Sequence, residues 1–285
     1  MLFKDVEIMN IAISEENKRN LQEIVKNTSN TWQSGRSEEE KYLDTLQGKI
    51  AEDLFQEFIL STNIDYVTYD SFRNDNYVKH APFDGLLFQK NLDTKIVNES
   101  KKLIINDVGN DSSGRISVST RQTLRSRSIY LVEIKSTKVN DKKRGNKTQI
   151  DYQKVSEVES LIENIKRDDF LTYPHFYRVG NISDLDNYYR LVTKYNPNIN
   201  KGGGLLDLLK IELANMPDIL VRVYIDFAGS KGLIIGYILR EDFIKNVEMK
   251  KMIKYGKSEG ALYLAKNLHY GTCIRNLVVD KKLWV

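Results

Sequence analysis

A carboxylate and a lysine stand two residues apart within an apolar stretch near the middle of the chain, residues 130–135 (YLVEIK). The composition of this stretch predicts a strand, along which successive side chains point to opposite faces. Glu133 and Lys135 therefore share one face. Because burying two charged groups costs several kcal/mol unless they are paired or bind a metal, the pattern indicates either a catalytic strand or a surface strand whose polar face holds both residues.

Asp84 is a second carboxylate in a suitable setting. It follows Pro82, which fits the entrance of a strand, and it precedes residues 85–88, which are typical of a buried strand. An acid at the mouth of an apolar strand can share a metal ion with Glu133 on a neighbouring strand. The alternative is an Asp-Gly turn, because Asp and Gly are common turn formers.

Glu52 lies on a helix that is predicted to start at a capping box, residues 37–40, and to run to about Leu60. The buried stripe of this helix comprises Ile50, Ala51, Leu54, Phe55, Phe58 and Ile59. At about 100° per residue, Glu52 falls at the edge of that stripe and can approach a site beneath the helix. The residues that point further out are Lys49, Asp53, Gln56 and Glu57. A solvated helix glutamate is the alternative interpretation of Glu52.

The order of these residues resembles that of the PD-(D/E)XK nucleases of the type II restriction endonuclease kind. Gly48-x-x-x-Glu52 lies on a helix, Asp84 opens a strand, and Glu133-x-Lys135 lies on a later strand. The resemblance covers about residues 40 to 165. It implies an α/β fold with a central mixed sheet flanked by helices, built on a helix, three antiparallel strands, a helix and a further strand at 219–227, with insertions and a C-terminal α/β extension.

The resemblance also implies Mg²⁺-dependent hydrolysis of phosphodiester bonds, with Mn²⁺ as a substitute metal. Mg²⁺ prefers oxygen ligands and neutralises charge on phosphoryl oxygens. Asp84 and Glu133 would hold it, together with the backbone carbonyl of Ile134. Glu52 would join directly, through water or at a second metal ion. Lys135 would orient or activate the attacking water and stabilise the developing charge.

Two features depart from the family's pattern. The name-giving Pro-Asp pair is Pro82-Phe83-Asp84 here, with one residue inserted, and Asp84 lies 49 residues before Glu133, which is a longer separation than usual. The long separation leaves Asp107 as a rival metal ligand. Asp84 is preferred because its apolar run follows the acid, whereas the apolar run near Asp107 precedes it and ends in a loop of Gly, Asn, Asp and Ser.

Positive charge is concentrated around the proposed catalytic strand. Residues 100–150 contain 12 Lys and Arg against 4 Asp and Glu, a net charge of +8, whereas the rest of the chain has a net charge of −4. Such a distribution favours a nucleic-acid partner, and a solvated charged loop is the alternative. The residues predicted to contact nucleic acid are Arg115, Arg121, Arg125, Arg127, Lys142, Lys143, Arg144, Lys147, Gln149 and Gln153.

Length and composition bound the remaining choices. The chain has 285 residues, of which 41% are hydrophobic, so it can bury a substantial core. A single cysteine excludes an intramolecular disulfide and a cysteine zinc cluster, and three scattered histidines do not make a histidine metal site. No stretch is long enough to span a membrane and no signal peptide is visible, so we expect a cytoplasmic protein without a membrane partner.

The remaining elements divide the chain into three parts: an N-terminal helical segment (1–36), a nuclease core (37–168) and a C-terminal α/β part (169–285). We expect a helix over 15–26 and another over about 148–166, with Gln149 and Gln153 near its start. Strands at 219–227 and 233–239 form a hairpin. Helical stretches near 242–254 and 259–267 and a strand over 272–279 follow.

The sequence therefore predicts a site-specific endonuclease that acts on duplex DNA. A homodimer would match the two strands of the duplex with two active sites. Two alternatives stay open, because fold alone does not determine substrate. One is a nuclease of the same fold that acts on branched DNA, single strands or RNA, and the other is a nucleic-acid-binding protein without catalysis.

Overall fold

The computed structural model of the chain describes residues 6–28, 37–79, 81–111, 115–172, 216–245, 248–251 and 262–284. Its main feature is a mixed sheet of six strands in the order β1-β7-β6-β4-β3-β2. The strands are β1 (Glu7–Asn10), β2 (Ile64–Thr68), β3 (Gly85–Gln89), β4 (Tyr130–Lys138), β6 (Ile219–Asp226) and β7 (Lys231–Leu239). Only β4 and β6 pair in parallel, and every other pair in this sheet is antiparallel.

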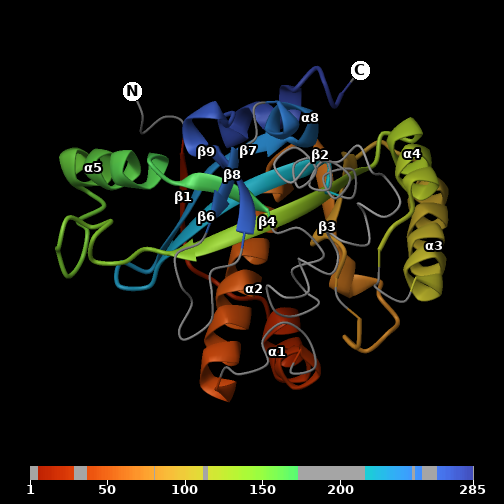
Figure 1. Cartoon of the computed structure of the whole chain (residues 1–285), viewed down its shortest axis with the longest axis horizontal. Helices are drawn as coiled ribbons and strands as arrows, with labels where there is room; N and C mark the ends of the chain where they lie inside the picture. Colours follow the sequence, from red (N-terminus) through yellow and green to blue (C-terminus); the bar gives the residue numbers. More distant parts are fainter. Residues whose placement is uncertain are drawn as a thin grey trace, which may run out of the picture.

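Helices lie on both sides of the sheet (Figure 1). They are α1 (Glu15–Thr28), α2 (Glu38–Leu60), α3 (Thr94–Asn110), α4 (Val118–Ser126), α5 (Val155–Lys166) and the short α8 (Arg240–Ile244). A smaller sheet pairs β5 (Asp169–Thr172) with β9 (Leu262–Asn267), and β9 with β8 (Glu248–Lys251). Among the described residues, no helix is both long and apolar enough to cross a membrane.

Helix α2 covers one face of the sheet, as its apolar stripe predicts. Its first turn carries the capping box, because the Ser37 side chain accepts from the Glu40 N–H and the Glu40 side chain accepts from the Ser37 N–H. The buried side of the helix packs on the even-numbered residues Val132 and Ile134 of β4, and on Val221 of β6, in one continuous core. This burial positions Glu52, one turn from the middle of the helix, above the strands of the proposed site.

The opposite face of the sheet has two separate cores. One lies under α5 and includes Leu220 and Tyr224 of β6, whereas the other lies under α3 and α4 and includes Leu86 of β3 and Leu131 of β4. In Figure 1, α5 lies at one end of the molecule and the α3–α4 pair at the other. Because side chains alternate along a strand, Glu133 and Lys135 lie on the same face as Leu131, between these two cores.

Several predicted boundaries were wrong. Helix α5 begins at Val155 rather than near residue 148, so Gln149 and Gln153 lie in the exposed segment before the helix. The Asp151 side chain explains the late start, since it accepts from the Gln153 N–H at 2.9 Å and forms a turn that competes with helix. The described residues of 242–267 form a short helix and two strands, and residues 274–279 form a 3₁₀ helix. The hairpin of β6 and β7 is confirmed.

Candidate active site

The Asp84 carboxylate lies in a gap between β3 and β4. Its backbone N–H donates to the Val132 carbonyl at 2.9 Å, and its Oδ2 accepts from the Ile134 N–H at 2.5 Å. The last cross-strand pair of β3 and β4 is Gly85 with Val132. Beyond this pair, the Ile134 N–H donates to the Asp84 carboxylate instead of to a main-chain carbonyl of β3. Because the N–H and C=O of one strand residue point to the same side, the Ile134 carbonyl is directed toward this gap as well.

Glu133 and Lys135 form an ion pair beside this gap. Their side chains are 17% and 31% exposed, so the pair is open to solvent while its neighbours Val132 and Ile134 are buried under α2. The structure therefore brings Asp84, Glu133 and Lys135 together, as their order in the sequence predicts.

Electrostatics link Glu52 to the same place. Burial raises the pKa of Asp84 well above its usual value, and the negative charges of Glu133 and Glu52 raise it further. The Lys135 ammonium opposes this shift. Ionised carboxylates repel one another, and a bound divalent cation would relieve that repulsion.

The groups near Asp84 that could contribute to a metal site are two carboxylates and one main-chain carbonyl. Among the residues that the structure describes, no three His, Cys, Asp or Glu side chains gather closely enough to hold a metal ion by themselves. Mg²⁺ usually keeps several waters and uses one or two carboxylates together with substrate phosphates. Asp84, Glu133 and the Ile134 carbonyl form a set of this type.

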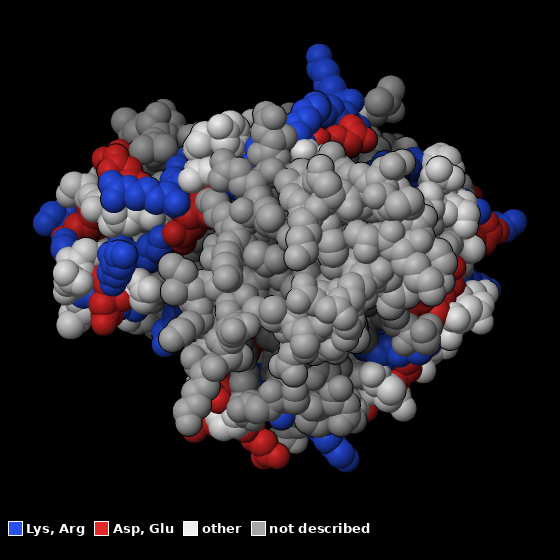
Figure 2. All heavy atoms as spheres, in the orientation of Figure 1, with Lys and Arg blue, Asp and Glu red and all other residues white. Residues whose placement is uncertain are grey.

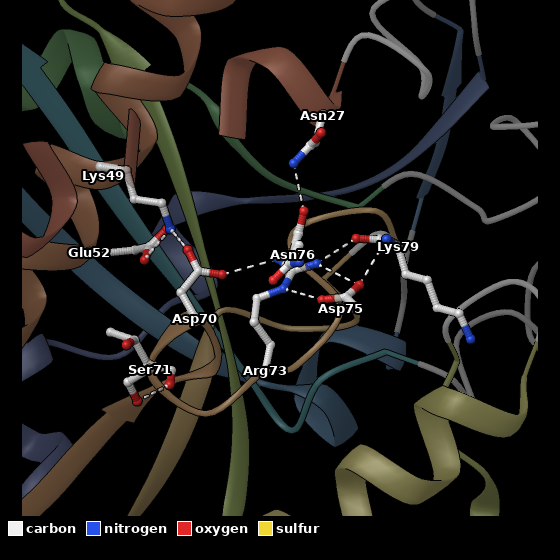
Figure 3. Close-up of polar contacts among 10 residues, drawn as sticks. Asn27, Lys49, Glu52, Asp70, Ser71, Arg73, Asp75, Asn76 and Lys79 are labelled. Atoms are coloured by element: carbon white, nitrogen blue, oxygen red, sulfur yellow. Dashed lines mark hydrogen bonds and ion pairs between the residues drawn. The ribbon is translucent and has the colours of Figure 1, made fainter. Parts of the chain in front are cut away.

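The Glu52 carboxylate is held by Lys49, which the sequence had placed among the outward-pointing residues. The Lys49 ammonium donates to both oxygens of Glu52 at 2.7 and 2.8 Å, and to Asp70 Oδ2 at 2.6 Å. Figure 3 shows the two carboxylates on either side of this one ammonium. All three side chains are about nine-tenths buried. The prediction that Lys49 points outward was therefore wrong.

Two buried carboxylates thus share one positive charge. Burial raises the pKa of Glu52 to about 7, against the attraction of Lys49, and the negative charge of Asp70 adds to the rise. Burial alone would lower the pKa of Lys49, yet the two carboxylates outweigh it and raise that pKa. Asp70 belongs to the 3₁₀ helix η2 (Tyr69–Ser71) directly after β2, and no sequence motif marked it as part of the site.

The network continues from Asp70 into the loop that leads to β3 (Figure 3). Arg73 donates to Asp70 at 3.1 Å and to Asp75 at 2.7 Å, and the Lys79 N–H donates to Asp75 at 2.8 Å. The Lys79 ammonium donates in turn to the last carbonyls of α3, which include those of Val108 and Gly109. These contacts connect α2, η2 and α3, and they hold the segment that enters β3 at Asp84.

Gly85 allows the close approach of a tyrosine next to Asp84. A Cβ atom at position 85 would lie 2.4 Å from Cε2 and 2.7 Å from Oη of Tyr66, whose ring also packs edge-on against Phe55 of α2. The Tyr66 hydroxyl is buried and has no hydrogen-bond partner among the described residues. Burial and nearby carboxylates, Glu52 and Asp84 foremost, raise its pKa.

Replacing Gly85 with alanine is therefore expected to destabilise the protein by about 1–3 kcal/mol, because the new methyl group would overlap a buried ring. Gly48 of α2 provides the matched control. A Cβ atom there would meet nothing within 4 Å, so Gly48→Ala is expected to stabilise the helix by about 0.5–1 kcal/mol. Urea unfolding of the two variants would test this, and equal shifts would contradict the packing argument.

The rival ligand Asp107 lies elsewhere. It belongs to α3, and its Oδ2 accepts from the Ser117 N–H at 2.6 Å at the start of α4. Its carboxylate thus joins two helices, whereas Asp84 lies beside the Glu133 strand.

Several of the predicted nucleic-acid contacts have structural partners instead. Arg121 is buried and donates to the Met216 carbonyl at 2.7 Å, and burial lowers its pKa to about 10. Arg144 is buried against Asp226 at 3.2 Å. Both of these predicted contacts therefore have partners inside the protein. The partly exposed ion pairs are Arg125 with Asp218, Arg127 with Glu99, Lys143 with Asp168, and Lys147 with Glu157.

These partners also explain why the sequence overstated the basic surface. The carboxylates of the pairs above come from outside residues 100–150. Arg115 is partly buried, and its backbone N–H donates to Asp111. Lys142, Gln149 and Gln153 remain exposed. Figure 2 shows Lys and Arg interspersed with Asp and Glu over the described parts of one face.

Comparisons of this chain with protein-family models, with curated proteins and with solved structures found no match.

Proposed function

We propose that this protein is a Mg²⁺-dependent endonuclease of the PD-(D/E)XK type that hydrolyses phosphodiester bonds in duplex DNA. The observation that carries the proposal is the Asp84 carboxylate, which lies between β3 and β4 beside the pair of Glu133 and Lys135. Acids and a lysine gathered at the end of the pairing between β3 and β4 are the groups that could bind a cation and a phosphate.

The arrangement of elements supports the same proposal. Helix α2 is followed by three antiparallel strands, β2, β3 and β4, then by α5, and β6 returns parallel to β4. Helices α3 and α4 lie between β3 and β4, and β5 lies between α5 and β6; with these read as insertions, the order agrees with the one that the resemblance implies. Strands β1 and β7 extend the sheet beyond β6, and β8 and β9 belong to a C-terminal extension.

Asp84, Glu133 and the Ile134 carbonyl would hold the Mg²⁺ ion, with Mn²⁺ as a substitute. When bound, the ion would neutralise charge on the phosphoryl oxygens and favour ionisation of a bound water. The N–H of Ile134 fixes the Asp84 carboxylate in place. Glu52, held by Lys49, contributes negative charge from the other side of the sheet.

Lys135 is placed to orient the attacking water and to stabilise the negative charge that develops on the phosphate. It is the more exposed member of its ion pair with Glu133. A half-buried ammonium beside a carboxylate is held in one position, which is the condition for electrostatic stabilisation of a transition state.

Two such sites are needed to cut both strands of a duplex, and we propose a homodimer as the acting form. Duplex DNA is the proposed substrate, and the cytoplasm is the proposed location of the protein. Among the predicted contacts, Lys142, Lys147, Gln149 and Gln153 are exposed and could contact the DNA.

The first test is cleavage by the wild-type protein. Duplex, single-stranded and branched DNA, with RNA as a control, would be incubated in Mg²⁺, in Mn²⁺ and in EDTA. Discrete duplex fragments that disappear in EDTA are the expected result. Cleavage restricted to branched DNA, single strands or RNA would change the substrate class, and binding without any cleavage in either metal would contradict catalysis.

A further inference from the structure

Arg222 lies next to Lys135 on the neighbouring strand. In the parallel pairing of β4 and β6, Lys135 is in register with Arg222, and Thr137 with Tyr224. Residues in register on adjacent strands face the same side. Leu220 and Tyr224, two positions before and after Arg222, lie in the core under α5, on the face that also holds Glu133. Arg222 therefore shares the face of the proposed active site.

The contacts of Arg222 leave its charge without a carboxylate. It is only 5% exposed, one of its terminal nitrogens donates to Thr137 Oγ1 at 2.7 Å, and its guanidinium carbon lies 5.1 Å from the centre of the Tyr224 ring. Its Nε is buried and has no hydrogen-bond partner, and among the described residues no carboxylate forms an ion pair with it.

Two other strongly buried arginines, Arg144 and Arg73, differ in this respect, whereas the buried Arg121 donates to a main-chain carbonyl. Arg144 pairs with Asp226, and Arg73 pairs with both Asp70 and Asp75. Burying a guanidinium without a counterion is costly, and two cations directly opposite each other on adjacent strands repel. Arg222 and Lys135 form such a pair of neighbours. The Glu133 carboxylate pairs with Lys135, so the charge of Arg222 is the one that a phosphate would balance.

A bulge in the sheet occurs at the same place. The pairing of β6 with β7 shifts between Arg222 and Val223, opposite Gly236. Gly236 has a φ of +157°, and a Cβ atom there would lie 2.5 Å from the Thr272 carbonyl oxygen. Bulges are frequent beside active sites, where they redirect a side chain.

We propose that Arg222 and Lys135 together bind a phosphate group of the nucleic-acid backbone at the site of Asp84 and Glu133. Lys135 has 31% of its side chain exposed, whereas Arg222 is 5% exposed and lies beside it on β6. A guanidinium carries five N–H donors in a rigid fork that matches phosphate oxygens, and Thr137 occupies only part of it. This inference rests on the proposed function, since it assigns the substrate's phosphate to two residues of that site.

The test is DNA binding in EDTA, which does not depend on cleavage. Fluorescence anisotropy of a labelled duplex would be measured over a series of salt concentrations for wild type, Arg222→Met and Arg222→Lys. Arg222→Met is expected to weaken binding by about ten- to a hundredfold and to reduce the slope of log K against log salt by about 1. Arg222→Lys is expected to keep the slope and recover part of the affinity.

Lys18→Gln is the matched control, because it removes one exposed positive charge from α1, on the α2 side of the sheet. It is expected to bind DNA like wild type. The melting temperature separates binding from folding: Arg222→Met is expected to melt no lower than wild type, since methionine fills similar space without a buried unpaired charge. A large drop in its melting temperature would overturn the inference, because Arg222 would then be structural.

The outcomes distinguish this inference from the proposed function. If wild type does not cut DNA in Mg²⁺ but Arg222→Met still changes the salt slope, the phosphate site stands and the nuclease proposal fails. If wild type cuts DNA but Arg222→Met keeps the wild-type slope and affinity, the nuclease proposal stands and the phosphate site fails. Absence of DNA binding by wild type would also overturn the phosphate site.

Discussion

Replacing Glu133 with glutamine is expected to lower the rate of DNA cleavage in Mg²⁺ by at least about 10²–10³-fold, the range typical for loss of one electrostatic group at an active site. Glutamine keeps the shape of the side chain but removes the charge that would hold the metal. The partner Lys135 is partly exposed, so water can solvate its ammonium and the fold should persist. Initial rates of plasmid cleavage would measure the effect.

The melting temperature of the same variant, measured with and without a divalent cation, separates metal binding from folding. Mg²⁺ or Ca²⁺ is expected to raise the melting temperature of wild type and not that of Glu133→Gln, because only a protein that binds the ion is stabilised by it. Glu163→Gln is the control, since Glu163 is an exposed residue of α5 outside the site. Undiminished cleavage by Glu133→Gln or by Lys135→Ala would exclude this site.

Replacing Lys49 with methionine is expected to destabilise the protein by about 3–5 kcal/mol, the usual cost of removing one partner of a buried ion pair. The change would leave Glu52 and Asp70 buried and facing each other without the ammonium that now lies between them. Urea unfolding, monitored by circular dichroism, would measure the change in the free energy of unfolding.

A double variant tests the physical cause. Adding Glu52→Gln to Lys49→Met removes one of the two unpaired carboxylates, so part of the lost stability should return and the two effects should not add. If Glu52→Gln lowers the free energy of unfolding by the same amount in Lys49→Met as in wild type, repulsion between the carboxylates does not cause the loss of stability. Retained stability in Lys49→Met alone would show that Asp70 and Glu52 do not need a shared counterion.

Local patterns account for the parts of the site that the sequence predicted. The alternation in residues 130–135 places Glu133 and Lys135 on one face, and the apolar run after Asp84 forms β3. The capping box starts α2 where it was expected. These features depend on residues within one turn or one strand of each other, so the sequence alone contains the information.

The hairpin of β6 and β7 is also a feature that local sequence predicts, because its turn residues and its two apolar runs are neighbours in the chain. The pairing of β1 with β7 does not, since it joins residues more than two hundred positions apart. Residues 248–251 and 262–267 show the limit of local propensity. They were expected to be helical, yet they pair as strands of a second sheet, one of them with β5, which lies far away in the sequence.

The sequence by itself determined which residue types could perform the chemistry and the strand that carries two of them. Only the tertiary structure decided which charges meet. It buried Lys49 between Glu52 and Asp70, neutralised Arg144 with Asp226, and set Arg222 beside Lys135 without a carboxylate. The physical reason is that periodicity and capping act over a few residues, whereas charges are paired or left unpaired by whichever distant segments the packing of the core brings together.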